Sequence, residues 1–205
     1  MRIIGITGPT GSGKTCFTER IRALGIPTVN ADELYHSMLV PPSECLNAIR
    51  AQFGDGVFRA DGSLDREALS ALVFSDGQKL ELLNKTVLNI VIAKIRSIIS
   101  ELEARGERTV AIDAPTLIES GFHKECDTVI SVISPSKARA ERISARDGIT
   151  PQRAAERIKA QRQDSFYTDN SDITVFNDGT AEEFEAKIDA LIAELALTDG
   201  KELVE

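Results

Sequence analysis

Eight residues near the N-terminus have the types and spacing of a phosphate-binding loop. They fit the pattern G-x-x-x-x-G-K-[ST] without a mismatch, and they are Gly8, Pro9, Thr10, Gly11, Ser12, Gly13, Lys14 and Thr15. Glycine lets the backbone curl until successive N–H groups face one phosphate. In such a loop Lys14 would reach the β- and γ-phosphates, and the Thr15 hydroxyl would ligate Mg²⁺. The motif predicts a nucleoside triphosphate site but leaves open what the triphosphate is used for.

A chance match in a glycine-rich turn is the alternative, and the flanking residues argue against it. Residues 2–7, Arg-Ile-Ile-Gly-Ile-Thr, are typical of a short buried strand, and residues 13–24 are typical of a helix. A helix that starts at the loop adds the partial positive charge of its N-terminus. Strand, loop and helix in this order are the context that such a motif requires.

Polar residues follow three further expected strands, at 26–30, 108–113 and 173–176. In a parallel sheet ligands bind outside the carboxyl ends of the strands, so these residues should share one edge. In chain order they are Asp32, His36, Asp113, Glu119, Asn177 and Gly179.

Three of these residues have candidate roles in phosphoryl transfer, each with a structural alternative. Asp32 could orient an acceptor hydroxyl and take its proton, or it could cap the helix that follows. Asp113 could hold Mg²⁺ through water or orient Lys14, or it could cap a loop. His36 could contact the substrate, although a lone histidine on a helix face is often structural.

A basic segment lies in the second half of the chain. Residues 137–162 carry eight basic and three acidic residues, a charge of +5 that leaves −13 for the remainder of a chain of net charge −8. Arg139, Arg142 and Arg146 share one expected helix face, and Arg153 and Arg157 share another. Two such helices would form a lid that brings arginines over bound phosphates, whereas the alternative is a pair of solvated helices.

The remaining pattern alternates strands with helices and predicts a mostly parallel sheet. Another strand is expected at 128–133, and residues 41–106 form a helical insertion with a long helix from about Asp76 to Ala104. Helix starts are signalled by Ser134-Pro135, Thr150-Pro151 and two capping boxes, Ser75 with Gln78 and Thr180 with Glu183.

Composition excludes several classes of protein. The 205 residues suffice for one α/β domain, and the net charge of −8 disfavours a general nucleic-acid binder. Apolar runs are too short and too charged for a membrane span, and the first residues predict no secretory signal. Three widely spaced cysteines suit a reducing cytosol. Residues 198–205 are polar and expected to fray.

The ordered set of motifs resembles the dephospho-CoA kinase family from Ile3 to about Leu195. The matching segments are Gly5 through Thr15, Asn30-Ala31-Asp32 with His36, Phe53-Gly54, Asp61 through Arg66, Asp113 through Glu119, Arg142 with Arg146-Asp147, Arg157 with Gln161, and Asn177-Asp178-Gly179. The resemblance implies that ATP phosphorylates the ribose 3′-hydroxyl of dephospho-CoA, giving CoA and ADP in the final step of coenzyme A synthesis. It implies a single P-loop kinase domain over residues 1–205, with a five-stranded parallel sheet in the order 2-3-1-4-5 flanked by helices.

The predicted subdivision of that domain assigns residues 1–40 and 106–205 to a nucleotide-binding core. Residues 41–105 form the substrate-binding insertion, and residues 137–165 form the lid. We predict a small-molecule kinase in the cytoplasm, without nucleic-acid or membrane partners, as a monomer or weak homo-oligomer.

The motifs and the resemblance together assign the site. The catalytic residues are Lys14, Asp32 and Arg142. ATP is expected on the phosphate-binding loop from Gly8 to Thr15 and on Cys16, Arg142, Arg146, Asn177 and Gly179. Dephospho-CoA is expected on Asp32, His36, Asp113, Glu119, Arg157 and Gln161. Mg²⁺ is expected on Thr15, with Asp113 acting through water.

Three features depart from the family's usual pattern, namely Asn30 in place of an aspartate, Thr116 in place of a leucine, and Leu88-Asn89 in place of a His-Pro pair.

Three alternative functions remain open. Another small-molecule P-loop kinase would differ only in the acceptor. A regulatory GTPase would need an Asn-Lys-x-Asp reader, which residues 84–87 lack. A non-catalytic nucleotide-binding protein would bind ATP without turnover.

Overall fold

The computed structural model describes residues 1–195, which form two compact units. The first unit comprises residues 1–29 and the chain from Leu102 onward, and the second comprises Asn30–Glu101. Residues 30–40, which the sequence-based subdivision places with the core, therefore belong to the second unit. The end expected to fray, residues 198–205, lies outside the described residues.

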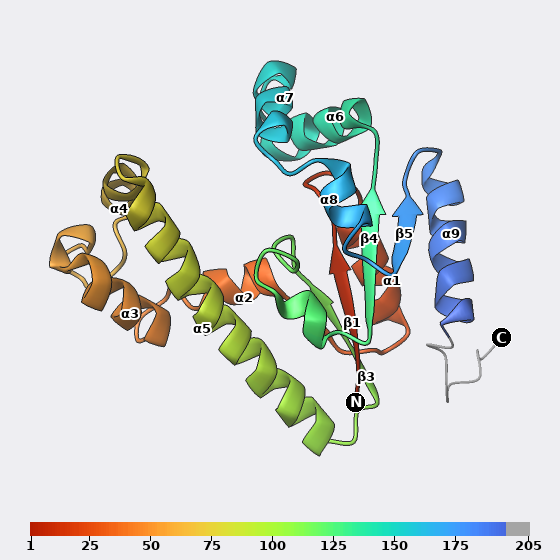
Figure 1. The fold of residues 1–205 in the computed structure, drawn as a ribbon, viewed down its shortest axis with the longest axis horizontal. Coiled ribbons are helices and arrows are strands. Elements are labelled where there is room, and N and C mark those ends of the chain that lie inside the picture. Colours follow the sequence, from red (N-terminus) through yellow and green to blue (C-terminus); the bar gives the residue numbers. More distant parts are fainter. Residues whose placement is uncertain (196–205) are drawn as a thin grey trace. The chain divides into compact units, whose positions relative to one another are not determined.

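A five-stranded sheet is the framework of the fold, in the order β2-β3-β1-β4-β5 (Figure 1). Its strands are β1 (Arg2–Thr7), β2 (Thr28–Asn30), β3 (Thr109–Asp113), β4 (Thr128–Ile133) and β5 (Ile173–Phe176). The pairs β1–β3, β1–β4 and β4–β5 run parallel. This arrangement confirms the predicted parallel sheet and its strand order. Register places Asp113 beside Ile6, so the carboxyl ends of β1 and β3 share one edge.

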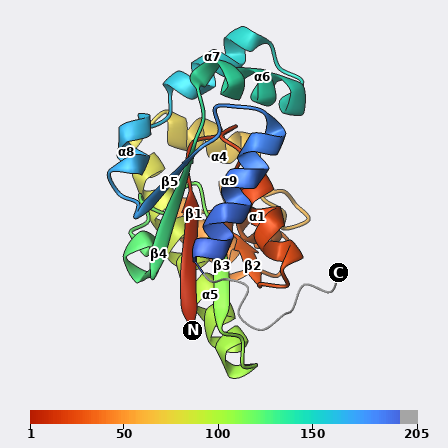
Figure 2. The same cartoon turned by 90° about the vertical axis from the view of Figure 1, so that its right-hand side faces the viewer.

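Helices cover both faces of the sheet, which explains why its central strands are continuous apolar runs. On one face, α1 (Lys14–Ala23) lies beside α9 (Ala181–Glu194) (Figure 2). Phe17 of α1 and Ile188 of α9 are fully buried in the core cluster with strand residues. On the other face, α8 (Asp164–Thr168) buries Tyr167 against Ile133 of β4. Each such side chain contributes about 1.5–3 kcal/mol when fully buried, so the two layers hold the sheet rigid beneath the loop.

A helical hairpin follows β4 in the segment predicted to be the lid. It consists of α6 (Ser136–Asp147) and α7 (Pro151–Lys159), and Gly148 between them adopts a left-handed conformation with φ 63°. Thr150 caps α7 as predicted, because its hydroxyl accepts a hydrogen bond from the Arg153 N–H at 3.3 Å. The prediction that Ser134 caps α6 is wrong, since α6 has no side-chain cap.

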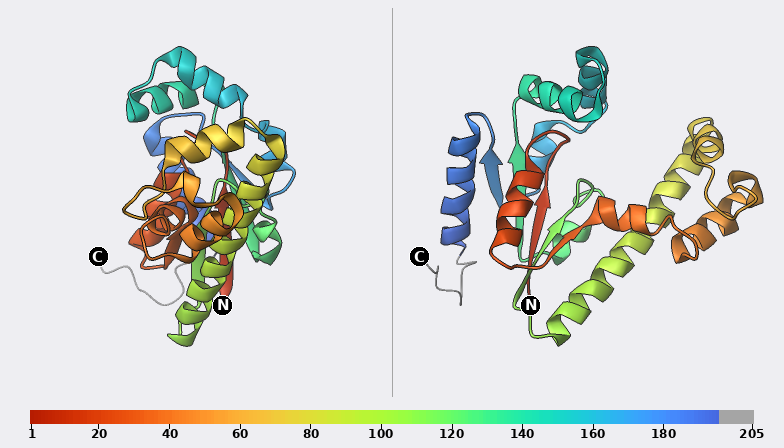
Figure 3. Two further views of the ribbon diagram at one scale, coloured as in Figure 1. Left: turned by 90° about the vertical axis from the view of Figure 1, so that its left-hand side faces the viewer. Right: turned by 180° about the vertical axis from the view of Figure 1, so that it is seen from behind.

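The second unit is helical, as predicted for the insertion (Figure 3). Its helices are α2 (Ala31–Ser37), α3 (Glu44–Phe53), the 3₁₀ helix η1 (Asp55–Val57), α4 (Arg66–Phe74) and α5 (Gly77–Ala104). Leu80, Leu83 and Val87 of α5 pack against a buried cluster that includes Cys45 and Ile49 of α3. Among residues 41–105 the structure contains one isolated bridge, Phe58 to Leu64, and no strand.

Two capping predictions have different outcomes. Thr180 and Glu183 form the predicted capping box at the start of α9. The box expected from Ser75 and Gln78 is wrong, because the Asp76 carboxylate accepts from the Gln78 N–H at 3.0 Å, while Ser75 donates to the Leu72 carbonyl. The helix therefore begins one residue later than its predicted cap implies.

Within residues 1–195 no helix combines the length and the apolar character needed to cross a membrane.

Candidate nucleotide site

The phosphate-binding loop connects β1 to α1, and its backbone requires glycine at two tightly packed positions. Gly8 has φ 140°, and a Cβ atom there would lie 2.3 Å from the Val132 carbonyl oxygen. Gly13 has φ 111°, and its Cβ atom would lie 2.4 Å from Nδ2 of Asn177. These backbone angles strongly disfavour other residues. The two glycines therefore let the loop press against β4 and the end of β5.

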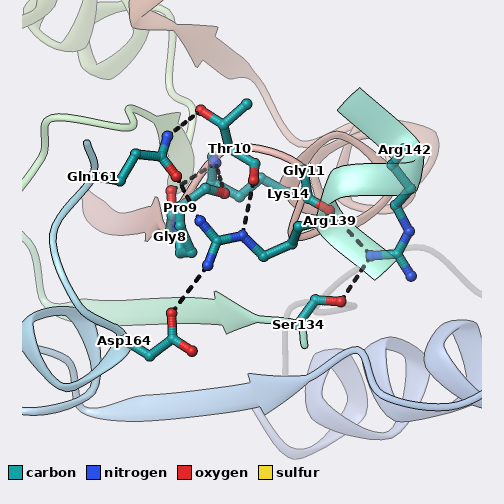
Figure 4. Close-up of polar contacts among 10 residues, drawn as sticks. All are labelled: Gly8, Pro9, Thr10, Gly11, Lys14, Ser134, Arg139, Arg142, Gln161 and Asp164. Atoms are coloured by element: carbon teal, nitrogen blue, oxygen red, sulfur yellow. Dashed lines mark hydrogen bonds and ion pairs between the residues drawn. The ribbon is translucent and has the colours of Figure 1, made fainter. Parts of the chain in front are cut away.

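Side chains from outside the loop hold three of its consecutive carbonyl groups. The contacts run from Arg139 Nε to Thr10 O at 3.1 Å, from Arg142 Nη1 to Gly11 O at 3.1 Å and from Asn177 Nδ2 to Ser12 O at 2.8 Å (Figure 4 draws the first two). In a trans peptide the C=O and the following N–H point in opposite directions. Holding the Thr10 and Ser12 carbonyls outward thus directs the N–H groups of Gly11 and Gly13 to the other side.

Arg142 links the hairpin to the loop and to β5. Its guanidinium donates to Ser134 Oγ at 3.0 Å and to Asn177 Oδ1 at 3.2 Å, in addition to the Gly11 carbonyl. Ser134 is therefore an acceptor for Arg142, and it lies one residue before Pro135, which occupies the N-cap position of α6. The structure brings together two residues predicted to bind ATP, Arg142 and Asn177, at one corner of the loop.

Arg139, which the sequence placed among the lid arginines but did not assign to the site, also contacts the loop. Its side chain is buried, with the residue 2% exposed, and burial lowers the pKa of its guanidinium. It donates to Asp164 Oδ1 at 3.2 Å and to Gln161 Oε1 at 2.5 Å, and Gln161 Nε2 donates to Thr10 Oγ1 at 2.6 Å (Figure 4). Gln161, predicted to bind dephospho-CoA, thus lies against the phosphate-binding loop in this structure.

Lys14 and Asp113 lie near the start of α1. Lys14 Nζ donates to the Gly8 carbonyl at 2.7 Å and to the Pro9 carbonyl at 3.0 Å, so the ammonium lies inside the curve of the loop. Asp113 is 4% exposed, and Thr18 Oγ1 donates to its Oδ2 at 3.0 Å. An ammonium and a carboxylate thus lie against the first two turns of α1, and Thr15 is exposed in the first of these turns.

Cys16 turns its side chain toward the protein interior, where it packs against the main core. Burial raises the pKa of its thiol, so the thiol stays protonated at neutral pH. A contact of Cys16 with ATP would therefore come from its backbone N–H.

Two of the predicted arginines bind an acid of the hairpin itself. Arg146 Nε donates to Asp147 Oδ1 at 2.7 Å, and Arg157 forms an ion pair with the same carboxylate. The Arg146 and then the Arg157 guanidinium hold the pKa of Asp147 below its ordinary range. Asp147 thus fastens α6 to α7 through both arginines.

Glu119 and Gly179, two further predicted site residues, follow β3 and β5 in the chain. Glu119 is exposed on the segment after β3. Burial, and next the charge of Glu119, raise the pKa of Tyr167 in α8. Gly179 immediately precedes the α9 capping box, and a Cβ atom there would lie 2.0 Å from Glu183 Oε2. Its absence of a side chain makes room for that cap.

Asp32 and His36 belong to the second unit, on α2. The cap of α2 is Asn30, whose Oδ1 accepts from the N–H groups of Asp32 and Glu33 at 3.0 Å each. Asp32 is therefore not the cap, and its carboxylate is exposed. His36 is also exposed and lies four residues further on, so the two side chains share one face of the helix.

Comparisons with known proteins point in one direction. A family model described as dephospho-CoA kinase matches residues 2–183. A dephospho-CoA kinase from Anaeromyxobacter dehalogenans is 35% identical over 203 residues, covering 99% of this chain and 96% of that protein. A solved structure from Thermus thermophilus has a TM-score of 0.76 at 30% identity, covering 95% of this chain and 97% of that one. A dephospho-CoA kinase from Campylobacter jejuni shares the fold, with a TM-score of 0.69 at 22% identity over 95% of this chain and 98% of that one.

Proposed function

The chain belongs to the dephospho-CoA kinase family, and from this premise we propose that it transfers the γ-phosphoryl group of ATP to the ribose 3′-hydroxyl of dephospho-CoA, giving CoA and ADP. The observation that carries the proposal is the phosphate-binding loop, whose carbonyls are held outward by Arg139, Arg142 and Asn177. Such a loop presents its N–H groups to an anion before the anion arrives. Preorganised donors of this kind supply much of the rate enhancement in phosphoryl transfer.

The triphosphate would lie along the loop, at the N-terminus of α1. The N–H groups of Gly11 and Gly13, the helix dipole and the Lys14 ammonium would neutralise its phosphates. Arg142 holds a positive charge against the Gly11 carbonyl, at the edge of the same loop. We assign it the stabilisation of charge that develops on the transferring phosphoryl group.

We assign Asp32 the role of the base that accepts the proton of the 3′-hydroxyl. Its support is that Asn30 takes over the capping of α2, which leaves the Asp32 carboxylate exposed and available for another partner. A carboxylate within hydrogen-bond reach of a hydroxyl orients it and receives its proton in the transition state. His36, one turn along the same face, would contact the acceptor nucleotide.

The side-chain oxygen groups of Thr15 and Asp113 suit Mg²⁺. Thr15 offers a hydroxyl and Asp113 a carboxylate, and hard oxygen donors are what Mg²⁺ prefers. In the described part of the chain, no group of three or more His, Cys, Asp or Glu residues gathers as a metal cluster. This pattern agrees with an ion held by few protein ligands together with phosphate oxygens and water. When bound, Mg²⁺ would neutralise charge on the phosphates.

We further propose a cytoplasmic monomer or weak homo-oligomer that acts on a small molecule without a nucleic-acid partner. Cys16, Cys45 and Cys126, all in the described region, carry free thiols, which suits a reducing compartment. The chain's net charge of −8 opposes general binding to a polyanion.

The proposal is tested by measuring ADP release from ATP and Mg²⁺ with dephospho-CoA as acceptor. Adenosine, AMP, CMP and a reaction without acceptor are run beside it, and ³¹P NMR of the product checks for a 3′-phosphomonoester. We expect turnover with dephospho-CoA to exceed turnover with every other acceptor. Turnover with another acceptor would replace the substrate assignment, and ATP binding without turnover on any acceptor would indicate a non-catalytic nucleotide-binding protein.

A further inference from the structure

The Arg139 side chain reaches three segments that are distant in sequence. From α6 it donates to the Thr10 carbonyl of the phosphate-binding loop, to Gln161 just after α7 and to Asp164 at the start of α8 (Figure 4). The sequence separations are 129, 22 and 25 residues. One buried guanidinium thus joins the phosphate-binding loop to Gln161, just after α7, and to Asp164, the first residue of α8.

These contacts close a ring around Thr10. Arg139 holds the Thr10 carbonyl oxygen, Arg139 also holds Gln161, and Gln161 in turn donates to the Thr10 hydroxyl at 2.6 Å. Arg139 therefore binds the backbone of Thr10, Gln161 binds its side chain, and Arg139 and Gln161 are hydrogen-bonded to each other. Rotation of the Thr10–Gly11 peptide would break the bond from Arg139 to the Thr10 carbonyl, so the ring restrains the direction of the Gly11 N–H as well.

Arg139 differs from the other arginines of the hairpin in being buried. Its side chain is 3% exposed, and its carboxylate partner Asp164 is 46% exposed. A charge buried this deeply needs its hydrogen bonds satisfied within the protein, and the ring and Asp164 provide them. The side chain faces the back of the loop, where carbonyls point, rather than the side to which the Gly11 N–H points.

We propose that Arg139 is a positioning residue for the triphosphate: it fixes the Thr10–Gly11 peptide and fastens the phosphate-binding loop to the α6–α7 hairpin. This inference rests on the proposed nucleotide site and adds a residue that acts on ATP without touching it. Arginine suits the role because its planar group donates in several fixed directions at once. Lysine carries the charge on a single nitrogen and cannot span the same three acceptors.

The test compares Arg139→Met, Arg139→Lys and Asp164→Asn with the wild type. Arg20→Gln is the matched control, because Arg20 also pairs with a carboxylate, that of Asp189, but lies on the exposed side of α1 away from the loop carbonyls. Three quantities are measured for each protein: the Kd for ATP by calorimetry, the separate kcat and KM values for ATP and dephospho-CoA, and the Tm.

We expect Arg139→Met to bind ATP more weakly and to lose about 10- to 100-fold in kcat/KM for ATP, the scale of a small misplacement at a reacting centre. The KM for dephospho-CoA should stay close to that of the wild type. Arg139→Lys should recover part of the ATP affinity, Asp164→Asn should lose less than Arg139→Met, and Arg20→Gln should match the wild type.

A folded Arg139→Met with wild-type Kd and KM for ATP would overturn the proposal, even if its Tm were lower. If that variant does not fold, wild-type ATP affinity in both Arg139→Lys and Asp164→Asn would overturn it instead. Failure of the proposed reaction is distinguishable: a wild type that binds ATP without phosphorylating dephospho-CoA refutes the reaction, while the ATP affinities still decide the role of Arg139.

Discussion

Three arginines on helix α6 have different surroundings and different partners. Arg139, Arg142 and Arg146 lie on α6 at spacings of three and four residues. Arg139 is buried behind the phosphate-binding loop, Arg142 holds the loop's edge, and Arg146 pairs with Asp147 beside it. Environment rather than residue type therefore decides which arginine is buried behind the loop, which contacts its edge and which fastens the hairpin.

At this scale we predict that Asp32→Asn separates binding from chemistry. Asparagine keeps the shape of the side chain but cannot take a proton, so kcat should fall by roughly two orders of magnitude or more. The Kd for ATP and the cap of α2 should be unchanged, because the cap is Asn30. Steady-state kinetics and ATP titration test this, with Glu33→Gln, the neighbouring exposed acid, as control. Wild-type kcat in Asp32→Asn would remove Asp32 from the mechanism.

A second residue-scale prediction concerns the ammonium inside the loop. Lys14→Ala removes the charge next to the Gly8 and Pro9 carbonyls, so both the affinity for ATP and kcat should fall. The measurement is ATP titration together with ADP release, and Lys124→Ala, an exposed lysine of the helix η2 (Phe122–Glu125), is the control. An unaffected rate in Lys14→Ala would contradict the assignment of the loop as the triphosphate site.

At the scale of elements, the cap of α2 supports the proposed base. Asn30 stands where the resemblance leads one to expect an aspartate, and its Oδ1 holds the N–H groups of the first turn. Both side chains are strong helix caps, since each offers an oxygen to these donors. Asn30 therefore still caps the first turn of α2, where Asp32 lies, although it departs from the family's usual aspartate.

We accordingly predict that Asn30→Ala destabilises the start of α2 by about 1 kcal/mol, the usual cost of losing a cap. Amide hydrogen exchange should show faster exchange at Asp32 and Glu33, and kcat should fall while the Kd for ATP does not change. Asn30→Asp, the matched control, should retain both protection and activity. Equal exchange in the alanine and aspartate variants would mean that the cap does not order this turn.

Local patterns in the sequence were sufficient to predict the strands, most helices and the loop. Strand β1 and helix α1 follow from an apolar run and a glycine-rich turn, and the order of strands follows from the family resemblance. The two capping errors have the same form, because each helix begins one residue later than predicted. Pro135 occupies the N-cap position of α6 instead of Ser134, and Asp76 replaces Ser75 as the cap of α5.

The candidate site was predictable to the extent that motifs carry it. Lys14, Arg142 and Asn177 contact the loop, and the loop motif, the arginine spacing of α6 and the end of β5 had indicated these three residues. The role of Arg139 was not predictable, because its burial depends on Thr10, 129 residues away, and on Asp164. No local spacing distinguishes an arginine that faces solvent from one that closes such a ring.

At the scale of the whole molecule, the protein consists of two units with separate apolar cores. The core under the loop contains Phe17 and Ile188, and the helical unit has its own cluster around Ile49. A ligand that binds the loop stabilises the native state of the unit that contains it by mass action. The size of that effect depends on the ratio of ligand concentration to Kd.

We predict that ATP at about 100 times its Kd stabilises the wild type by about 2.7 kcal/mol. For a chain of this size that corresponds to a rise in Tm of roughly 5–10 °C. Thermal unfolding with and without ATP measures it, and Lys14→Ala at the same ATP concentration should show a smaller rise. An equal rise in both proteins would mean that ATP binds elsewhere.

The order of strands also determines when the loop can take shape during synthesis. β1 leaves the ribosome first, yet its two neighbours in the sheet are β3 and β4, which begin at Thr109 and Thr128. Arg139, Arg142 and Asn177, which hold the loop carbonyls, are translated later still. The helical unit, by contrast, is one continuous stretch, Asn30–Glu101, and can form its contacts earlier. The first residues made are thus among the last to reach their working conformation, and a nascent chain halted before Asn177 carries the motif without the complete support that shapes it.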